Sequence, residues 1–463
     1  MNRLLLLLAA TLTAGCAPHV ELAVAPAVYS EQWRAAPAAA AGASAPPPAE
    51  AAGLPASLAA AFASPDLEAL VARALRANAD IGAAVARVAQ ARAQLGIARA
   101  EALPVVTASA ALRETRTDDS GNSLFDFSTG TAGLDVSWEL DLFGRLAAGR
   151  RAARARFAAA AFDRDAIALA VEAETARAFV QYAALAGRIA LIDRNLQSAR
   201  ELERIIAVRR RLGVATRVDT GIAAVEVRQL EVERSRLVQA RSRIRNALAV
   251  LVGDEAPSFA PPEADLADFA VPDVAAVQPP VLIVRRPDIR AAEARIAAAS
   301  GDVGRARAAF FPRLRLGASG LGQAAALGGP LGATLAIGAD LLAPIFDRGR
   351  LNGELAFAGA AQRESVETYR GALLDALREA EDGLTAAVEA RARHVLLGDI
   401  LGEARTTARL ARLQYVEGDA DLQTVLDAER RLVAVEDALA VATQERLEAS
   451  IDLYRAMGGN PRG

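Results

Sequence analysis

The chain contains the same arrangement of residues twice, and this tandem duplication constrains the fold more than any other feature. The segment from Ala79-Asp80-Ile81 to Ala102-Leu103-Pro104 is matched by the one from Pro287-Asp288-Ile289 to Phe310-Phe311-Pro312, so that the two prolines lie 208 residues apart. Leu142-Phe143-Gly144-Arg145-Leu146 is matched by Ile345-Phe346-Asp347-Arg348-Gly349-Arg350-Leu351, and Gly213 and Gly253 recur 205 residues later as Gly418 and Gly458. Such a repeat predicts two copies of one structural unit.

Each copy predicts a helical segment, two strands, a very long helix, a short turn and another long helix. Residues 351–414 contain no proline, and over residues 422–457 apolar residues recur at alternating spacings of three and four, as in a coiled-coil seam. A helix of about 60 residues would be about 90 Å long, which is too long for a compact domain. We therefore expect a mainly α-helical fold with a small β part.

The composition argues against several classes of function. The chain has 463 residues, and its 53 basic and 56 acidic residues give a formal net charge of -3, so no positive field favours nucleic acid. One Cys and two His argue against a metal cage, a disulfide framework and most His-based catalysis. No glycine-rich phosphate loop and no nucleophile–base pair is visible in the sequence. We expect neither an enzyme nor a bound cofactor.

The N-terminus is typical of an exported protein. A short basic start is followed by an apolar run over residues 4–10, too brief to cross a bilayer as a stable helix. Leu12-Thr13-Ala14-Gly15-Cys16 resembles a bacterial lipobox, in which the Cys is acylated, although Leu stands four rather than three places before Cys16. The alternative is an ordinary signal peptide. Residues 36–52 are almost all Ala, Pro, Gly and Ser, as in an extended tether.

These observations predict six segments along the chain. We expect a signal peptide over residues 1–15, a lipidated tether over 16–63, the first repeat over 64–253, a connector over 254–286, the second repeat over 287–459 and a short tail over 460–463.

Four segments, two in each copy, alternate apolar and polar residues: 105–113, 131–142, 313–319 and 331–341. This period of two is typical of membrane β-strands, and it also fits half-buried strands of a soluble sheet. A lipid-facing sheet cannot leave an edge open, and the smallest single-chain barrels use about eight strands. If these strands face lipid, three copies would have to pool twelve of them around a pore, and their long helices would continue it as a tube.

The same residues resemble the TolC-like outer-membrane efflux ducts, in the lipoprotein branch called NodT-like or OprM-like. The resemblance extends from about Ser64 to Gly459, and the matching stretches include Trp138-Glu139-Leu140-Asp141-Leu142-Phe143-Gly144-Arg145 and Phe310-Phe311-Pro312. The most specific of them is Arg285-Arg286-Pro287-Asp288-Ile289-Arg290-Ala291-Ala292-Glu293. It implies a homotrimer with a twelve-stranded barrel in the outer membrane and an α-helical barrel crossing the periplasm. It further implies docking onto a periplasmic adaptor and an inner-membrane pump of the RND type, and export of drugs or other small molecules. The rival hypothesis is a lipid-anchored periplasmic coiled-coil scaffold or adaptor.

The resemblance also implies a periplasmic aperture closed by rings of carboxylates. Asp219 and Asp427 align with the aperture carboxylates of the family, and Asp421 lies in the same turn region as Asp427. An alternative is that Asp219 and Asp421 are helix N-caps. The family often has an apolar plug residue near Gln423, for which Leu422 or Leu426 would substitute here.

Two further sets of residues follow from this hypothesis. The adaptor would dock at the helix tips, formed by Arg211, Leu212, Gly213, Glu417 and Gly418, where the glycines could equally be left-handed helix ends. Asp135, Glu139, Asp141 and Asp340 would face the pore, whereas Trp138 on the opposite face would anchor the membrane interface.

Overall fold

The computed structural model describes residues 33–34, 58–117, 125–272, 279–324 and 331–459, and Cys16 and the predicted leader lie outside these ranges. The described residues belong to two units. The sheet unit comprises Ala86–Ala161 and Ala291–Gly371, and the hairpin unit comprises the described parts of Val28–Val85, Phe162–Arg290 and Ala372–Gly463.

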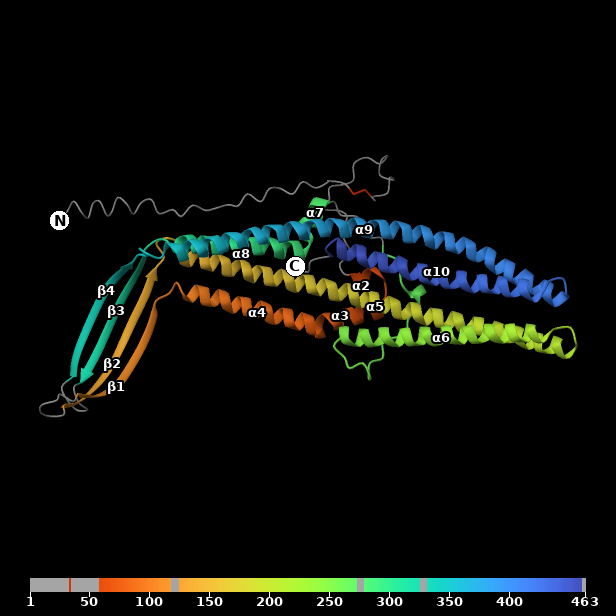
Figure 1. Ribbon diagram of the computed structural model, residues 1–463, viewed down its shortest axis with the longest axis horizontal. Coiled ribbons are helices and arrows are strands. Elements are labelled where there is room, and N and C mark those ends of the chain that lie inside the picture. Colours follow the sequence, from red (N-terminus) through yellow and green to blue (C-terminus); the bar gives the residue numbers. More distant parts are fainter. Residues whose placement is uncertain (1–32, 35–57, 118–124, 273–278, 325–330, 460–463) are drawn as a thin grey trace. The chain divides into compact units, whose positions relative to one another are not determined.

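The order of elements confirms the tandem repeat (Figure 1). Three short helices lie outside the repeated pattern: α2 (Leu58–Ala61), α3 (Pro65–Ala77) and α7 (Pro279–Arg285), together with the 3-10 turn η3 (Leu266–Asp268). The first copy contains α4 (Ala79–Ala100), β1 (Val105–Thr117), β2 (Phe125–Leu140), α5 (Arg145–Arg211) and α6 (Arg217–Leu251). The second contains α8 (Pro287–Ala308), β3 (Arg313–Ala324), β4 (Leu331–Leu342), α9 (Arg348–Glu417) and α10 (Leu422–Ala456).

The matching helices have nearly the same lengths in the two copies. Helices α4 and α8 each have 22 residues, and α6 and α10 each have 35. The long helices α5 and α9 have 67 and 70 residues. None of the described helices is apolar enough over 18 residues to cross a membrane.

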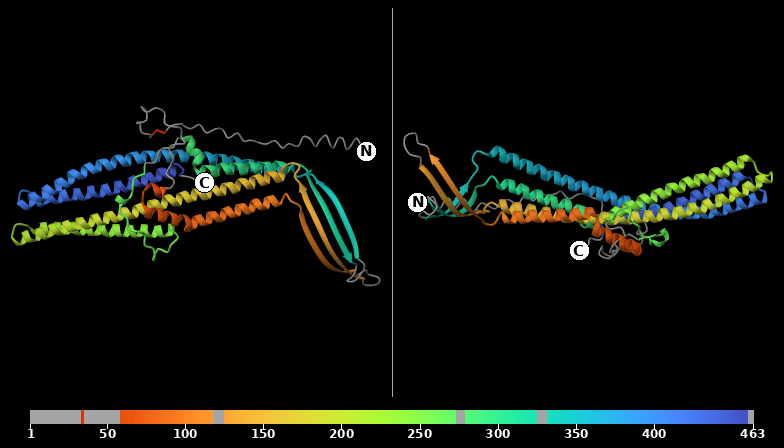
Figure 2. Two further views of the ribbon diagram at one scale, coloured as in Figure 1. Left: turned by 180° about the vertical axis from the view of Figure 1, so that it is seen from behind. Right: turned by 90° about the horizontal axis from the view of Figure 1, so that it is seen from below.

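The four strands form one antiparallel sheet in the order β1-β2-β3-β4, so the two copies join through β2 and β3. Each strand continues from a helix of the sheet unit (Figures 1 and 2). The register confirms the predicted alternation, because apolar residues stand opposite one another on one face. Two such rows are Ala108, Leu134, Gly320 and Leu335, and Val106, Val136, Ala318 and Ile337.

The apolar face of the sheet is exposed in the single chain. Ile337 is 81% exposed, and Leu335 and Leu341 on the same strand are also largely exposed. Beside the sheet, helices α5 and α8 approach closely, because a Cβ placed on Gly301 would lie 2.8 Å from the Cβ of Ala152. Only glycine fits at that crossing.

The hairpin unit is built from the pairs α5–α6 and α9–α10, which lie side by side in both views (Figures 1 and 2). Its core includes a cluster formed by both hairpins: Leu202, Ile206, Ala223, Tyr415, Val425 and Leu426. A second cluster packs α5 against α6 through Leu185, Ile192, Leu196, Val227 and Leu237. Part of the apolar surface of the long helices is thus buried between helices of the same chain.

Arg286, in the most specific sequence motif, ties three elements of the hairpin unit together. Its side chain is buried, and its guanidinium pairs with Asp288 at 2.7 Å and with Glu379 of α9 at 2.9 Å. It also donates to the carbonyl oxygen of Ala456, at the end of α10, at 3.1 Å. The start of α8 is therefore fixed to α9 and to the end of α10.

Candidate functional site

The turn between α5 and α6 is formed by a left-handed glycine followed by a capping box. Gly213 has φ +80°, and the N–H of Val214 donates to the carbonyl of Arg209 at 2.9 Å. Thr216 is the N-cap of α6. The carboxylate of Asp219 accepts from the backbone N–H of Thr216 at 2.7 Å and from its hydroxyl at 2.9 Å. The alternative that Asp219 is the N-cap is wrong, because Asp219 occupies the third helical position and closes the box from there.

The turn between α9 and α10 repeats this design with the two residue types exchanged. Gly418 has φ +93°, and Asp421 is the N-cap of α10. Its carboxylate accepts from the hydroxyl of Thr424 at 2.6 Å and from its N–H at 2.8 Å. Both hydrogen bonds lower the pKa of Asp421, and the one from the Thr424 hydroxyl has the larger effect. At the 205-residue spacing, Thr216 and Asp219 correspond to Asp421 and Thr424.

Asp427 lies on an exposed polar row that links α10 to α6. Its side chain is 51% exposed, and it accepts from the amide nitrogen of Gln423 at 3.0 Å. Arg430 approaches it to 3.7 Å and donates at 2.8 Å to Glu226 on α6. We call these residues the Asp427 row: Gln423, Asp427, Arg430 and Glu226. Within this row the carboxylate of Asp427 is accessible to solvent, and it does not cap a helix.

Leu422 and Leu426, the two candidates for an apolar plug, both contact the core of the hairpin unit. Leu426 is only 2% exposed and packs with Leu202, Ile206 and Ala223 in the core that joins the two hairpins. Leu422 is partly buried against the same cluster. Leu426 therefore already packs against other helices of the single chain. A core leucine and a lumen-facing leucine recur at the same helical spacing, so the sequence pattern alone does not separate them.

The helix tips expose both charge and apolar surface. Arg211 and Glu417 are the last residues of α5 and α9 and are exposed. Leu212 and Val214, on either side of Gly213, are also largely exposed. Arg209 is engaged within the chain, because its guanidinium lies 4.4 Å from the ring centre of Tyr415 and donates to the Tyr415 carbonyl at 3.0 Å.

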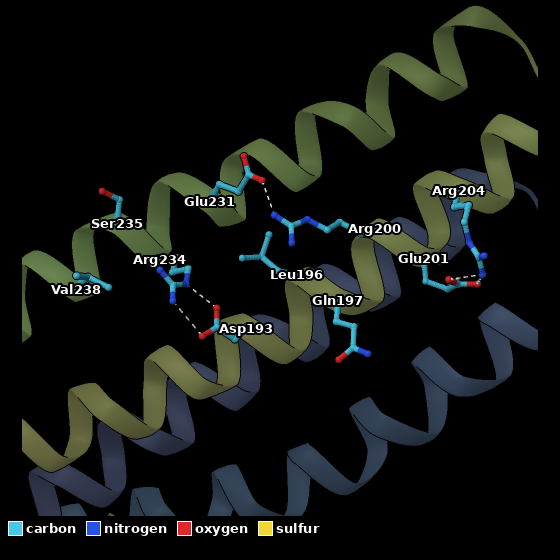
Figure 3. A pocket seen from close by; sticks show the side chains of 10 residues that line it. All are labelled: Asp193, Leu196, Gln197, Arg200, Glu201, Arg204, Glu231, Arg234, Ser235 and Val238. Atoms are coloured by element: carbon cyan, nitrogen blue, oxygen red, sulfur yellow. Dashed lines mark hydrogen bonds and ion pairs between the residues drawn. The ribbon is translucent and has the colours of Figure 1, made fainter. Parts of the chain in front are cut away.

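A charged groove between α5 and α6 was not predicted from the sequence (Figure 3). It has a volume of about 870 Å³, and ion pairs cross it between Asp193 and Arg234 at 2.6 Å and between Arg200 and Glu231 at 2.8 Å. The second pair recurs 205 residues later as Arg405 and Glu436, which lie 3.3 Å apart between α9 and α10. A search for opposite charges that repeat at this spacing would have found it.

The four predicted pore-facing residues have different local roles. Glu139 and Asp340 both stand opposite Arg315 in the sheet register, which gives a charged row of Glu139, Arg315 and Asp340 on one face. Glu139 also accepts from Arg145 at 2.9 Å. Asp135 is exposed on the same face, opposite Thr107 and Ser319.

Two neighbouring residues connect the sheet to the helices. The carboxylate of Asp141 accepts from the N–H groups of Leu146 at 3.0 Å and Ala147 at 2.6 Å, so it caps the start of α5. Trp138 lies on the opposite face of the sheet from Glu139, and its indole N–H donates to the carbonyl of Ala102 at 3.0 Å. Asp141 therefore has a structural role that its polar position in the sequence did not reveal.

Comparisons with known proteins agree with this architecture. The family model described as outer membrane efflux protein matches residues 70–254 and 279–459. The chain is 34% identical over 411 residues to the pyoverdine export outer membrane protein OpmQ of Pseudomonas aeruginosa, covering 86% of each chain. It is 32% identical over 369 residues to the outer membrane protein OprJ of the same species, covering 78% of this chain and 77% of OprJ.

A solved structure extends the likeness to the fold. The outer-membrane channel OprN matches with a TM-score of 0.80 and 29% identity, over 88% of this chain and 94% of OprN. The two segments of the family match correspond to the two copies of the repeat and together cover most of the chain. The chain therefore belongs to the outer membrane efflux protein family and is a subunit of an outer-membrane efflux channel.

Proposed function

We propose that three copies of this chain close into a passive, gated duct with a twelve-stranded barrel in the outer membrane and a helical tunnel in the periplasm. The four-stranded sheet carries this proposal. Its edges are β1 and β4, and large apolar side chains are exposed along one face. Unpaired backbone groups at a sheet edge cannot face hydrocarbon, and four strands are too few to close a barrel. Three copies supply twelve strands and no open edge.

The duct would receive its cargo from a periplasmic adaptor and an inner-membrane pump of the RND type, and would catalyse no reaction itself. The adaptor would dock at the helix tips, at Arg211, Leu212, Gly213, Glu417 and Gly418. The exposure of Leu212 beside charged helix ends supports this docking surface. The relative OpmQ is named as a pyoverdine export protein. The cargo of this duct would be drugs or other small molecules, selected mainly by the pump.

The aperture of the duct would be lined by Asp427, with Asp219 and Asp421 at the adjacent helix starts. Three copies would bring three Asp427 carboxylates into one ring, where they repel one another unless they are paired or bind a cation. The exposure of Asp427 in the Asp427 row supports this role. Ion passage through the closed duct would then depend on charge at this ring.

The N-terminal segments would anchor the duct. Acylation of Cys16 after removal of residues 1–15 would fix the tether 16–63 to the outer membrane, ahead of the repeats at 64–253 and 287–459 and their connector. Mass spectrometry of the N-terminal peptide from purified membranes tests this. A free thiol at Cys16, or cleavage at another site, would contradict the anchor.

The experiment that tests the duct is conductance of the purified protein in planar bilayers. We expect discrete channels from a species with the mass of a trimer, and Asp427→Ala should raise their conductance because it removes the ring charge. Asp219→Asn, which removes a charge but keeps a capping acceptor, should add to the effect. Asp419→Ala is the matched control, because Asp419 is an exposed acid in the same turn.

Two results would contradict the proposal. A water-soluble monomer that forms no channels would contradict the duct as a whole. Channels whose conductance and cation block are the same with Asp427→Ala as without it would contradict the carboxylate ring alone.

A further inference from the structure

The first turns of α5 are rich in arginine and contain no acidic residue. Between Asp141 and Asp163 the charged residues are all basic: Arg145, Arg150, Arg151, Arg154 and Arg156. At the start of α9, by contrast, the exposed Arg350 has an acidic partner one turn away, Glu354. The start of α5 therefore carries positive charge that its own sequence does not balance.

Two of these arginines have carboxylate partners on the polar side of the sheet. Arg145 donates to Glu139 at 2.9 Å, and Glu139 lies on the polar face. Arg156 pairs with Asp302 of α8. At 3.6 residues per turn, Arg145 and Arg156 lie only about 20° apart around α5. This side of α5 therefore continues the polar face of the sheet.

The other three arginines lie on the opposite side of α5. Arg150, Arg154 and Arg151 lie about 140°, 180° and 240° around the helix from its first residue, Arg145. All three are exposed, and within the part of the chain that the structure describes none of them has an ion pair or a side-chain hydrogen bond. The guanidinium of Arg151 extends over α8, where it lies 3.9 Å from the Cβ position of Gly304.

Helix α8 adds a fourth charge on the same side. Arg307 lies about 140° around α8 from Asp302, the partner of Arg156 on the polar side. Arg305 lies only about 60° from Asp302, and its side chain is 3.9 Å from the Cβ position of Gly149. Arg305 therefore belongs to the polar side and Arg307 to the other. We call the four residues on that other side the arginine patch: Arg150, Arg151, Arg154 and Arg307.

The arginine patch adjoins the apolar face of the sheet and lies away from its edges. Helix α5 follows β2 and α8 precedes β3, the two inner strands, so copies that meet at β1 and β4 would leave this surface open. Trp138 lies on the apolar face two residues before the end of β2. Along this face, apolar strand residues are followed by an indole and then by arginines. This order is typical of the boundary between hydrocarbon and water in membrane proteins.

The geometry of the helix directs the α5 arginines toward the sheet. Each Cα–Cβ bond of an α-helix is tilted toward the helix N-terminus, and the N-terminus of α5 is its end beside β2. Arg150 and Arg154 lie about 8 and 14 Å along the axis from the first residue of α5. A headgroup layer is about 5–8 Å thick, and an arginine stem can lie along apolar surface while its guanidinium extends to a polar layer. The patch is therefore within reach of headgroups around the sheet.

The second copy of the repeat shows that the long helix does not need these arginines. At the spacing of 205 residues, the positions of the three α5 arginines hold Leu355, Ala356 and Gly359 on α9. Helix α9 nevertheless has 70 residues, against 67 in α5. The arginines are thus a feature of one copy only, on the surface where β2 and β3 continue into helices.

We propose that the arginine patch binds the phosphate groups of anionic phospholipids, such as phosphatidylglycerol, at the periplasmic surface of the outer membrane. This inference rests on the proposed lipid-facing barrel. Guanidinium groups bind phosphate through paired hydrogen bonds, and each basic residue near an anionic membrane surface adds to the attraction. Bound headgroups supply the negative charge that α5 lacks, and they fix the depth at which the sheet lies in the membrane.

Fluorescence quenching by brominated lipids tests the proposal, because Trp138 lies beside the patch. The chain has two tryptophans, so Trp33→Phe leaves Trp138 as the only one. This protein is reconstituted in vesicles of phosphatidylethanolamine and phosphatidylglycerol in equal amounts, in which one lipid or the other carries brominated acyl chains. We expect the brominated phosphatidylglycerol to quench Trp138 more strongly.

Substitutions in the patch show whether its charge causes this preference. Arg151→Gln with Arg154→Gln should lower the affinity for phosphatidylglycerol relative to phosphatidylethanolamine by about fivefold or more, since one basic residue near an anionic surface already contributes about that factor. Arg151→Lys with Arg154→Lys should keep most of the preference. Arg305→Gln is the matched control, because it removes the same charge from the polar side of α8. Raising NaCl from about 0.1 to about 1 M should weaken the preference, because the Debye length falls from about 10 to about 3 Å.

Conductance measured on the same samples separates this inference from the proposed function. If the protein forms conducting trimers but the two brominated lipids quench Trp138 equally, the duct stands and the patch binds no headgroup. If the preference is unchanged in the double Gln variant, the patch is not the site. If inorganic phosphate at constant ionic strength removes the preference, the patch binds small anions instead of lipid. If neither lipid quenches Trp138, the sheet does not contact hydrocarbon and the proposed barrel fails as well.

Discussion

Glu429 is an acidic side chain of the hairpin unit whose surroundings raise its pKa. It lies on α10 with Arg412 of α9 at 4.0 Å, and Glu436 lies further along its own helix. Burial raises its pKa, Arg412 opposes the rise, and Glu436 adds to it. Because the net shift is upward, desolvation outweighs the attraction of Arg412.

We expect Glu429→Gln to stabilise the protein near neutral pH. A carboxyl whose folded pKa is raised contributes stability below its unfolded pKa, and that stability is lost as pH rises through the folded pKa. The variant should therefore unfold at a higher temperature than wild type at pH 8, with the difference shrinking toward pH 4, as followed by circular dichroism in detergent. Glu445→Gln is the control, because Glu445 pairs with Arg393 on a more exposed part of the same helix. A constant difference across this range would contradict the role of burial.

At the scale of elements, the sheet has two faces that should respond oppositely to charge. Ile337 and Ala336 are neighbours on β4, and the register places them on opposite faces. We expect Ile337→Lys to reduce the amount of assembled protein, because a lysine on the lipid face near the bilayer centre costs about 2–4 kcal/mol. Ala336→Lys should assemble and shift ion selectivity toward anions.

Gel mobility of unheated samples and reversal potentials in planar bilayers measure these two effects. Equal assembly of both variants would mean that the apolar face does not contact lipid.

The sequence was sufficient for elements whose pattern is local. The alternation along β1 to β4 follows from the geometry of a strand alone, and the proline-free stretch over residues 351–414 predicted a long helix that lies within α9. It was not sufficient where the outcome depends on which helices meet. Leu426 is buried because α5 and α6 cover it, Asp141 is engaged because α5 begins beside it, and Arg209 is held by Tyr415 of α9. The partners of Leu426 on α5 and α6 and the partner of Arg209 on α9 are far apart in the chain, so no spacing in the sequence reveals them. The contact of Asp141 is local, but it depends on where α5 begins, which the sequence pattern did not fix.

At the scale of the whole chain, Arg286 joins the beginning and the end of the second copy. Replacing it by Gln leaves Glu379 and the Ala456 carbonyl without their guanidinium partner in a buried region. We expect Arg286→Gln to cost about 3–5 kcal/mol, the range for breaking a buried ion pair from one side. Arg285→Gln, at the adjacent and more exposed position, should cost much less. Denaturant unfolding of the protein in detergent compares them, and equal midpoints would mean that the Arg286 network contributes little.

The exchanged Thr–Asp pairs make the two hairpins of one chain unequal at otherwise matching ends. Asp219 corresponds to Thr424, and Asp427 corresponds to Ile222, so the acids of the two copies stand at different heights along their helices. In a closed ring of three chains, six hairpin ends would alternate between two electrostatic types, and the mouth would have threefold rather than sixfold symmetry. A partner protein with six identical binding segments would have to bind two types of hairpin end. A partner that distinguishes the two types would bind only three of the six ends.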